Sequence, residues 1–155
     1  MNEDIERVRA IADYQFGKNA GKVLFPDDTR IEYSKNTNRP RHLYIGDIMI
    51  ANFRATDALF TLTIAGAKRL NNLEGLTGYV VVIDDVLEFI ENGKNLFAKH
   101  VAEAGPSIRP GDEVIIRDTS GSVAALGKAE LTSEEMKRFK NGQAVDVRRG
   151  RKRHR

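Results

Sequence analysis

The sequence has no cysteine and no tryptophan among its 155 residues. Without cysteine there is no disulfide framework, no thiolate zinc site and no cysteine nucleophile. Its longest apolar runs, such as residues 79–83, are far shorter than the roughly 20 residues that a membrane-spanning helix needs. Residues 1–9 are charged and contain no apolar signal-peptide core. These absences lead us to expect a cytoplasmic protein that does not contact a membrane.

Negative charge is missing from the C-terminal end. Residues 148–155 hold six Lys/Arg and no acid, whereas the preceding part of the chain holds 19 Lys/Arg against 22 Asp/Glu. A block of like charge this dense repels itself and is typical of a mobile arm for phosphate-rich partners. Such an arm binds nucleic acid through counterion release and reads no sequence. Two alternatives stay open: a solvated tail that keeps the protein soluble, or a patch for anionic membranes.

The first half of the sequence predicts a small α+β domain. Apolar residues at helical spacing predict a helix over residues 3–16, with Asn2 as its N-cap and Gly17 just past its end. Thr63 is placed to cap a second helix that runs through Leu70. We expect three strands, of which the first two flank a polar hairpin, at residues 30–34, 43–51 and 59–62.

The second half predicts a small mixed β-barrel with two short helices. Asp84 is expected to cap the first helix, which Gly93 ends. Thr132 and Glu135 have the spacing of a capping box for the second helix. Because residues 71–78 are rich in turn formers, we place the domain boundary there. We expect strands at residues 79–83, 96–102, 113–117, 122–131 and 143–148.

Three motifs of the second half resemble a PUA domain, the RNA-binding module named after pseudouridine synthases and archaeosine transglycosylases. They lie at residues 83–99, 108–114 and 125–129. In the first half, residues 8–17 and 59–70 are similar to the domain that precedes PUA in archaeal tRNA-guanine transglycosylases. The resemblance implies three parts, namely a pre-PUA α+β domain at 1–75, a PUA domain at 79–150 and a basic tail at 151–155.

This resemblance implies a noncatalytic RNA-binding protein. We expect it to bind structured tRNA in support of tRNA modification, here archaeosine-type guanine transglycosylation, with a separate catalytic transglycosylase chain as a further candidate partner. The catalytic barrel of that family needs a few hundred residues that this sequence does not hold. Two alternatives stay open: a small RNA-modification enzyme with an unrecognised active site in the first domain, or a ribosome-associated adaptor.

The RNA-binding face of the family follows the first PUA helix, the next strand and the segment after the last strand. Gly93 at a helix end allows φ > 0 and close approach of a nucleic-acid backbone, and lysines there offer charge to phosphate. A plain helix stop and solvated surface lysines are the alternatives. With the basic tail included, the residues expected to contact RNA are Gly93, Lys94, Asn95, Lys99, Arg148, Arg149, Arg151, Lys152 and Arg153.

Other features are weaker candidates. Phe97 alternates with Lys99 in the same expected strand, so it either stacks on a base or belongs to the core. Arg109 lies in a turn that we interpret as scaffold. The hairpin that holds Lys35, Arg39, Arg41 and His42 is either a second basic surface or a soluble loop, and the soluble loop is favoured because polar hairpin tips are common.

We expect no catalytic site, cofactor or metal. Residues 121–128 superficially resemble a phosphate loop, but five residues separate the glycines, and Ala129 stands where a hydroxyl residue would hold magnesium. The three histidines have no short-range pairing that would predict a metal site or a catalytic motif. The adjacent Asp84 and Asp85 are explained by a helix N-terminus, which favours negative charge.

Overall fold

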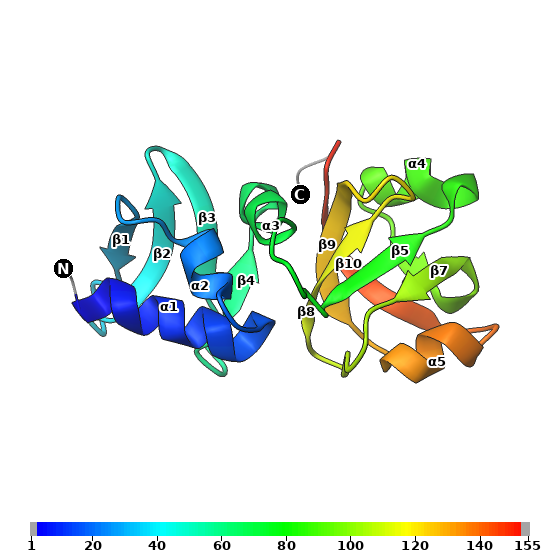
Figure 1. The fold of residues 1–155 in the computed structure, drawn as a ribbon, viewed down its shortest axis with the longest axis horizontal. Helices are drawn as coiled ribbons and strands as arrows, with labels where there is room; N and C mark the ends of the chain where they lie inside the picture. Colours follow the sequence, from blue (N-terminus) through cyan, green and yellow to red (C-terminus); the bar gives the residue numbers. More distant parts are fainter. Residues whose placement is uncertain (1–2, 153–155) are drawn as a thin grey trace. The chain divides into compact units, whose positions relative to one another are not determined.

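A computed structural model describes residues 3–152 of the chain. The chain folds as two compact units, Met1–Gly75 and Leu76–Arg155, and Figure 1 shows their helices and strands. Asn2, expected as an N-cap, lies outside the described residues. No helix in the described part of the chain is long and apolar enough to cross a membrane.

The first unit is a four-stranded antiparallel sheet with helices packed on it (Figure 1). The strand order follows the sequence, β1-β2-β3-β4. Helix α1 buries one face at helical spacing, which is the amphipathic pattern that the sequence predicted. The elements are α1 Glu3–Phe16, α2 Ala20–Leu24, β1 Arg30–Tyr33, β2 Pro40–Ile45, β3 Ile48–Phe53, β4 Phe60–Leu62 and α3 Ile64–Leu70.

The expected single strand at residues 43–51 is wrong, because the chain reverses there. Strands β2 and β3 form a hairpin in which Ile45 pairs with Ile48. Gly46 makes the turn with a φ of 59°, in the left-handed region that glycine enters without strain. Apolar residues run through both strands, so the pattern did not reveal the reversal.

The end of the first unit follows the prediction more closely. Thr63 caps α3, since its hydroxyl oxygen accepts a hydrogen bond of 3.1 Å from the Gly66 backbone N–H. The five-residue helix α2 was not expected. It packs against α1 so closely that a Cβ on Gly21 would lie 2.3 Å from the Arg9 carbonyl oxygen.

The second unit is a mixed, nearly closed barrel of strands ordered β6-β10-β9-β8-β5-β7. Strands β5 and β8 are parallel and the other neighbours are antiparallel. The elements are β5 Tyr79–Val82, the 3₁₀ turn η1 Asp84–Val86, α4 Leu87–Glu91, β6 Leu96–Phe97, the 3₁₀ turn η2 Ala98–His100, β7 Val101–Ala104, β8 Glu113–Arg117, β9 Val123–Ala129, α5 Ser133–Arg138 and β10 Gln143–Gly150. The predicted fold class, an α+β domain followed by a PUA-like mixed barrel with two short α-helices, is confirmed.

The expected strand at residues 96–102 is broken in two. Strand β6 pairs with β10, whereas β7 pairs with β5 at the opposite end of the strand order. The 3₁₀ turn η2 between them carries the chain from one partner to the other. Lys99 therefore lies in η2 and not in the same strand as Phe97.

The two helices of the barrel begin differently. The capping box of α5 is confirmed: the Thr132 hydroxyl accepts from the Glu135 N–H at 3.1 Å, and the Glu135 carboxylate accepts from the Thr132 N–H at 2.9 Å. The expected Asp84 cap is wrong. Asp84 opens the 3₁₀ turn η1 ahead of α4, and its carboxylate instead accepts a 2.9 Å hydrogen bond from the Thr119 hydroxyl.

Candidate nucleic-acid interface

The end of α4, the residues between α4 and β6, and the last residues of β10 with those just after it meet at one junction. The Asn95 side-chain oxygen accepts a 2.9 Å hydrogen bond from the Val147 backbone N–H. The Lys152 backbone N–H donates 3.0 Å to the Glu91 carbonyl oxygen. Residues 93–95 and the segment 148–152, which are far apart in the sequence, are therefore brought together.

Two glycines allow this junction to close. Gly93 ends α4 with a φ of 91°, and its N–H donates 3.0 Å to the Ile90 carbonyl oxygen. A Cβ on Gly150 would lie 2.7 Å from the Gly93 nitrogen and 2.2 Å from the Glu91 carbonyl oxygen. Gly93 is buried, so the close backbone approach that we expected from a nucleic acid is made here by the chain's own β10.

Arg148 is held by a carboxylate. Its guanidinium donates to both oxygens of Glu113, and the bond from Nη1 to Oε1 is 2.9 Å. The Glu113 side chain is 1% exposed. A forked pair of this kind orients the guanidinium and neutralises a buried charge.

Arg151 joins two further carboxylates. Its Nε donates 2.6 Å to Glu91 Oε2, and its Nη1 donates 2.9 Å to Asp118 Oδ2. Lys152 adds a second cation to Glu91, with 3.2 Å between Nζ and Oε1. The expected self-repelling, mobile arm therefore differs from the described residues 148–152, most of whose cations are tied to carboxylates of the barrel.

The same contacts set the pKa values of the two carboxyls. Burial alone would raise the pKa of Asp118, but hydrogen bonds from Ser120, Arg151 and Ser122 outweigh it and lower that pKa to about 2. Burial likewise opposes ionisation of Glu91, and the hydrogen bonds from Arg151 and Lys152 lower its pKa. Both groups are carboxylates at neutral pH.

The remaining predicted cations at the junction have no carboxylate. Among residues 3–152, Lys94 and Arg149 form no ion pair, and Lys94 is exposed. Lys94 lies between Gly93 and Asn95, which contact Gly150 and Val147 of β10. Arg149 lies in β10 between those two contacted residues. The junction thus leaves Lys94 and Arg149 with charge that the described chain does not neutralise.

Lys99 lies elsewhere. The neighbouring Ala98 N–H donates 2.9 Å to the Gly142 carbonyl oxygen, at the start of β10. An eight-residue strand is about 25 Å long, so Lys99 is separated from the junction by most of that length. It is exposed, in η2, which contacts α5. Arg153 lies outside the described residues.

The two weaker candidates of this domain are placed as follows. Phe97 is 45% exposed on β6, so it does not belong to the core. The Arg109 backbone N–H donates 2.9 Å to Asp112 Oδ2, and Gly111 turns the chain with a φ of 95°. This fits the interpretation of that turn as scaffold.

Within residues 3–152, no group of three or more His, Asp or Glu could hold a metal ion.

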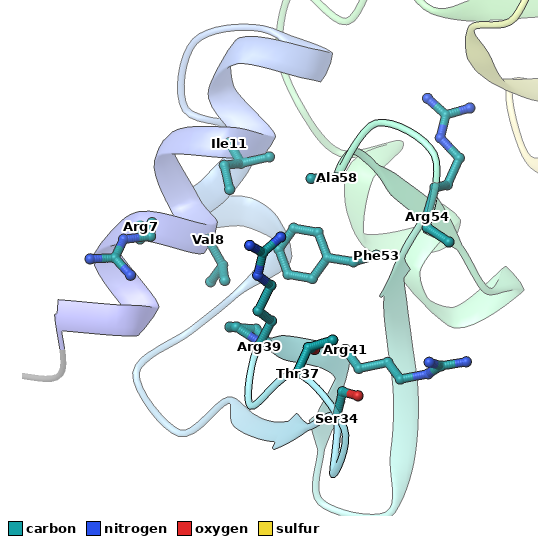
Figure 2. Close-up of a pocket in the computed structure, with 12 residues that line it drawn as sticks. Arg7, Val8, Ile11, Ser34, Thr37, Arg39, Arg41, Phe53, Arg54 and Ala58 are labelled. Carbon is teal, nitrogen blue, oxygen red and sulfur yellow. The ribbon is translucent and has the colours of Figure 1, made fainter.

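Sequence reasoning missed a cavity in the first unit. It has a volume of about 500 Å³ and is lined in part by Arg39 and Arg41 of the basic hairpin (Figure 2). Helix α1 and the β3–β4 loop supply other lining residues, and Phe53 also lines it. The hairpin charges were visible in the sequence, but nothing local joined them to residues so distant along the chain.

Comparison with known protein families covers nearly the whole chain. Residues 6–74 match the patch-forming domain C2 of tRNA-guanine transglycosylase, and residues 78–151 match the PUA domain. The chain is therefore a PUA-domain protein. More particularly, it resembles the C-terminal domains of archaeal tRNA-guanine transglycosylase, as the sequence motifs predicted.

Individual relatives agree with this assignment. The chain is 44% identical over 149 residues to the tRNA-guanine(15) transglycosylase of Methanothermobacter thermautotrophicus, covering 96% of this chain and 23% of that protein. It is 43% identical over 144 residues to that of Thermococcus kodakarensis, covering 92% of this chain and 24% of that protein. The chain thus spans about a quarter of the length of these relatives.

Solved structures share the fold. A hypothetical protein from Pyrococcus horikoshii aligns with a TM-score of 0.74 at 22% identity, covering 96% of this chain and 90% of the other. A conserved PUA domain protein from Thermoplasma acidophilum aligns with a TM-score of 0.57 at 26% identity, covering 70% and 68%. The fold of nearly the whole chain therefore also occurs in a protein of similar length.

Proposed function

We propose that this protein binds structured RNA, most specifically tRNA, and takes part in archaeosine-type guanine transglycosylation without catalysing the exchange itself. The observation that carries the proposal is the 44% identity to a tRNA-guanine(15) transglycosylase across 96% of this chain. The matched part consists of a C2 domain and a PUA domain. The partner that this implies is a chain that carries the catalytic barrel.

The junction between the end of α4, residues 93–95 and the last residues of β10 is the RNA contact surface in this proposal. Lys94 and Arg149 supply phosphate contacts, because neither has a carboxylate among the described residues. Arg148, Arg151 and Lys152 act mainly by fixing β10 against α4 and β8. Asn95 positions the same strand through the Val147 N–H. Phosphate contacts of this kind orient an RNA but do not read its sequence.

A noncatalytic role is supported by what base exchange requires. Exchange needs a nucleophile and a shaped pocket that receives an extruded base. Two exposed carboxylates are the ones that we propose to test as nucleophiles, one in each unit: Asp57 pairs with Arg54 at 3.2 Å, and Asp84 accepts from Thr119 at 2.9 Å. Each carboxylate therefore has a local structural role in a turn.

Two assays test the proposal together. Fluorescence anisotropy with a labelled tRNA transcript should show binding by the full chain, in preference to an RNA duplex of equal length. Guanine exchange with radiolabelled guanine should be absent with this chain alone. Adding it to a catalytic transglycosylase chain should raise the apparent affinity of that chain for tRNA, because a second tethered binding surface raises the effective concentration.

Either of two results would overturn the proposal. One is the absence of tRNA binding by the folded chain at low salt, where phosphate contacts are strongest. The other is guanine exchange by this chain alone that disappears in Asp57→Ala or Asp84→Ala while the protein stays folded. The second result would establish a small RNA-modification enzyme instead.

A further inference from the structure

The cavity of the first unit lies between α1 and two loops of the sheet. Its volume is about 500 Å³, within the range of about 300–1,000 Å³ that is usual for small-ligand sites. Figure 2 shows α1 on one side, the β1–β2 hairpin below and the β3–β4 loop opposite α1. All its lining residues belong to the first unit, so the cavity is formed without the PUA domain.

The charge of the lining is of one sign. Four arginines and no acidic residue line the cavity. Two of the four have carboxylates just outside it, because Arg7 pairs with Asp4 at 3.6 Å and Arg54 pairs with Asp57 at 3.2 Å. The positive charges of the lining that have no acidic partner among the described residues therefore belong to the other two arginines.

The two lining arginines without an acidic partner in the described chain are Arg39 and Arg41. Neither guanidinium has a hydrogen-bond or ion-pair partner among residues 3–152, and both side chains are exposed. Figure 2 shows the Arg39 side chain rising into the cavity beside Phe53, while Arg41 points outward from the same hairpin. A guanidinium presents a planar fork of N–H donors that matches phosphate oxygens. This arrangement favours a ligand that carries an anionic group at the hairpin side.

The deeper part of the cavity is apolar. Val8 and Ile11 of α1 face Phe53 across it (Figure 2). The Phe53 ring is fixed from behind by the buried Phe60, with 4.3 Å between ring centroids. A rigid aromatic face beside aliphatic side chains suits a flat ring, since bases stack on aromatic residues without regard to sequence.

The loops around the cavity are held by hydrogen bonds. In the hairpin, the Ser34 N–H donates 2.8 Å to the Arg39 carbonyl oxygen, and the Asn38 N–H donates 2.8 Å to the Ser34 carbonyl oxygen. In the β3–β4 loop, the Leu59 N–H donates 3.1 Å to Asp57 Oδ1. Because both loops are fixed, the cavity is formed before any ligand enters.

We propose that this cavity binds one unpaired nucleotide of an RNA strand. Its base packs among Phe53, Val8 and Ile11, its phosphate is bound by Arg39, and Arg41, which points outward from the same hairpin (Figure 2), meets the adjoining phosphate of the strand. An inorganic anion would leave the apolar part empty, and an acidic peptide would bring no flat ring to the Phe53 face. The choice of RNA as the source of the nucleotide rests on the proposed function, whereas the cavity and its charges do not.

The test uses the full chain and a labelled single-stranded oligoadenylate of about five nucleotides, a length within the usual site size of one single-strand-binding module. The variant Arg39→Ala/Arg41→Ala should weaken its binding at least tenfold. The matched control is Lys18→Ala/Lys22→Ala, which removes two exposed cations of the same unit that do not line the cavity. The control should change the affinity less than threefold, although it changes the net charge equally.

A second variant separates filling of the cavity from loss of charge. Ala55 lines the cavity and is exposed, so Ala55→Trp places a ring in its opening while every arginine is kept. It should also weaken oligoadenylate binding at least tenfold, with an unchanged melting temperature. Ultraviolet cross-linking of the oligoadenylate should map to the peptide that contains Phe53, and this cross-link should disappear in both variants.

Four results would overturn the proposal. They are equal effects of the arginine and lysine pairs, no effect of Ala55→Trp, competition by inorganic phosphate as strong as that by adenosine monophosphate, and tighter binding of an oligoglutamate peptide than of oligoadenylate. If tRNA binds but oligoadenylate does not depend on Arg39 and Arg41, only this inference fails. If oligoadenylate binds in an Arg39- and Arg41-dependent way but tRNA does not bind, only the proposed function fails.

Discussion

The C-terminal basic segment, residues 148–152, and the β1–β2 hairpin use their positive charges in opposite ways. In the segment, Arg148, Arg151 and Lys152 are paired with the carboxylates of Glu113, Glu91 and Asp118. The hairpin, residues 30–45, also holds four Lys/Arg, yet two of its arginines, Arg39 and Arg41, have no partner in the described part of the chain. The density of charge along a sequence is therefore a poor measure of the charge that remains available to a ligand.

The difference arises from where the carboxylates lie. Strand β10 pairs with β9 and passes the end of α4. Buried acids lie in α4, in β8 on the other side of β9, and just after β8. A buried carboxylate is stable only when it is paired and hydrogen-bonded. The hairpin extends from an open sheet, and no described acid of the first unit is buried. Most cations in the segment thus pair with carboxylates of the barrel, whereas Arg39 and Arg41 in the hairpin pair with none among the described residues.

The largest expected effect is that of Arg151→Ala on stability. Removing this side chain leaves Glu91 and Asp118 without their shared guanidinium, and breaking such a pair costs about 3 kcal/mol of unfolding free energy. Arg39→Ala, in the hairpin, should cost less than about 0.5 kcal/mol. Denaturant unfolding of both variants measures the difference, and equal losses would contradict the contrast between the two regions.

The next largest effect is a difference in stability between variants of two neighbouring residues of the segment, Arg148 and Arg149. Arg148→Ala removes a forked, charge-assisted pair with the buried Glu113, which should cost about 2 kcal/mol. Arg149→Ala removes a cation with no ion pair among residues 3–152 and should cost less than about 0.5 kcal/mol. Equal melting temperatures of the two variants would mean that the Glu113 pair contributes nothing measurable.

A smaller effect on the unfolding free energy should appear at acidic pH. Since the folded-state pKa of Asp118 is about 2, below its unfolded value of about 3.9, its contribution to stability is complete above about pH 5 and is lost as the pH falls toward 2. The lowered pKa of Glu91 acts in the same direction. Asp118→Asn should flatten the fall in unfolding free energy over this range.

Asp85→Asn is the control, because Asp85 is exposed and has no hydrogen-bond or ion-pair partner in the described residues. Its pH profile should follow that of the wild type. If Asp118→Asn also follows the wild type, Asp118 is not held by Arg151 and its neighbouring hydroxyl and amide donors.

The features that the sequence predicted well are local. Helix α1, the Thr63 cap and the Thr132–Glu135 capping box depend on residues within a few turns of each other. Of the errors, the missed turn at Gly46 is local, whereas the broken strand at residues 96–102 involves distant partners. Nothing within residues 96–102 indicates that its two ends pair with β10 and β5.

The candidate site shows the same limit. Gly93 was correctly expected to have a positive φ, but its contact with Gly150 depends on β10. The partners of Arg151 lie 33 and 60 residues away in the sequence. Only the three-dimensional structure separates such paired cations from Lys94 and Arg149. A deletion of residues 149–155 would therefore not isolate RNA contacts, because it would remove the structural Arg151 together with Arg149.

The central claim is that RNA is bound by the cations that no carboxylate neutralises. The most direct measurement is the slope of log K for tRNA against log salt concentration, for the wild type and for Lys94→Ala/Arg149→Ala. The slope of the double variant should be smaller by about 0.7–0.9 for each phosphate that it no longer neutralises, with the melting temperature unchanged. An unchanged slope and affinity in a folded double variant would contradict the central claim.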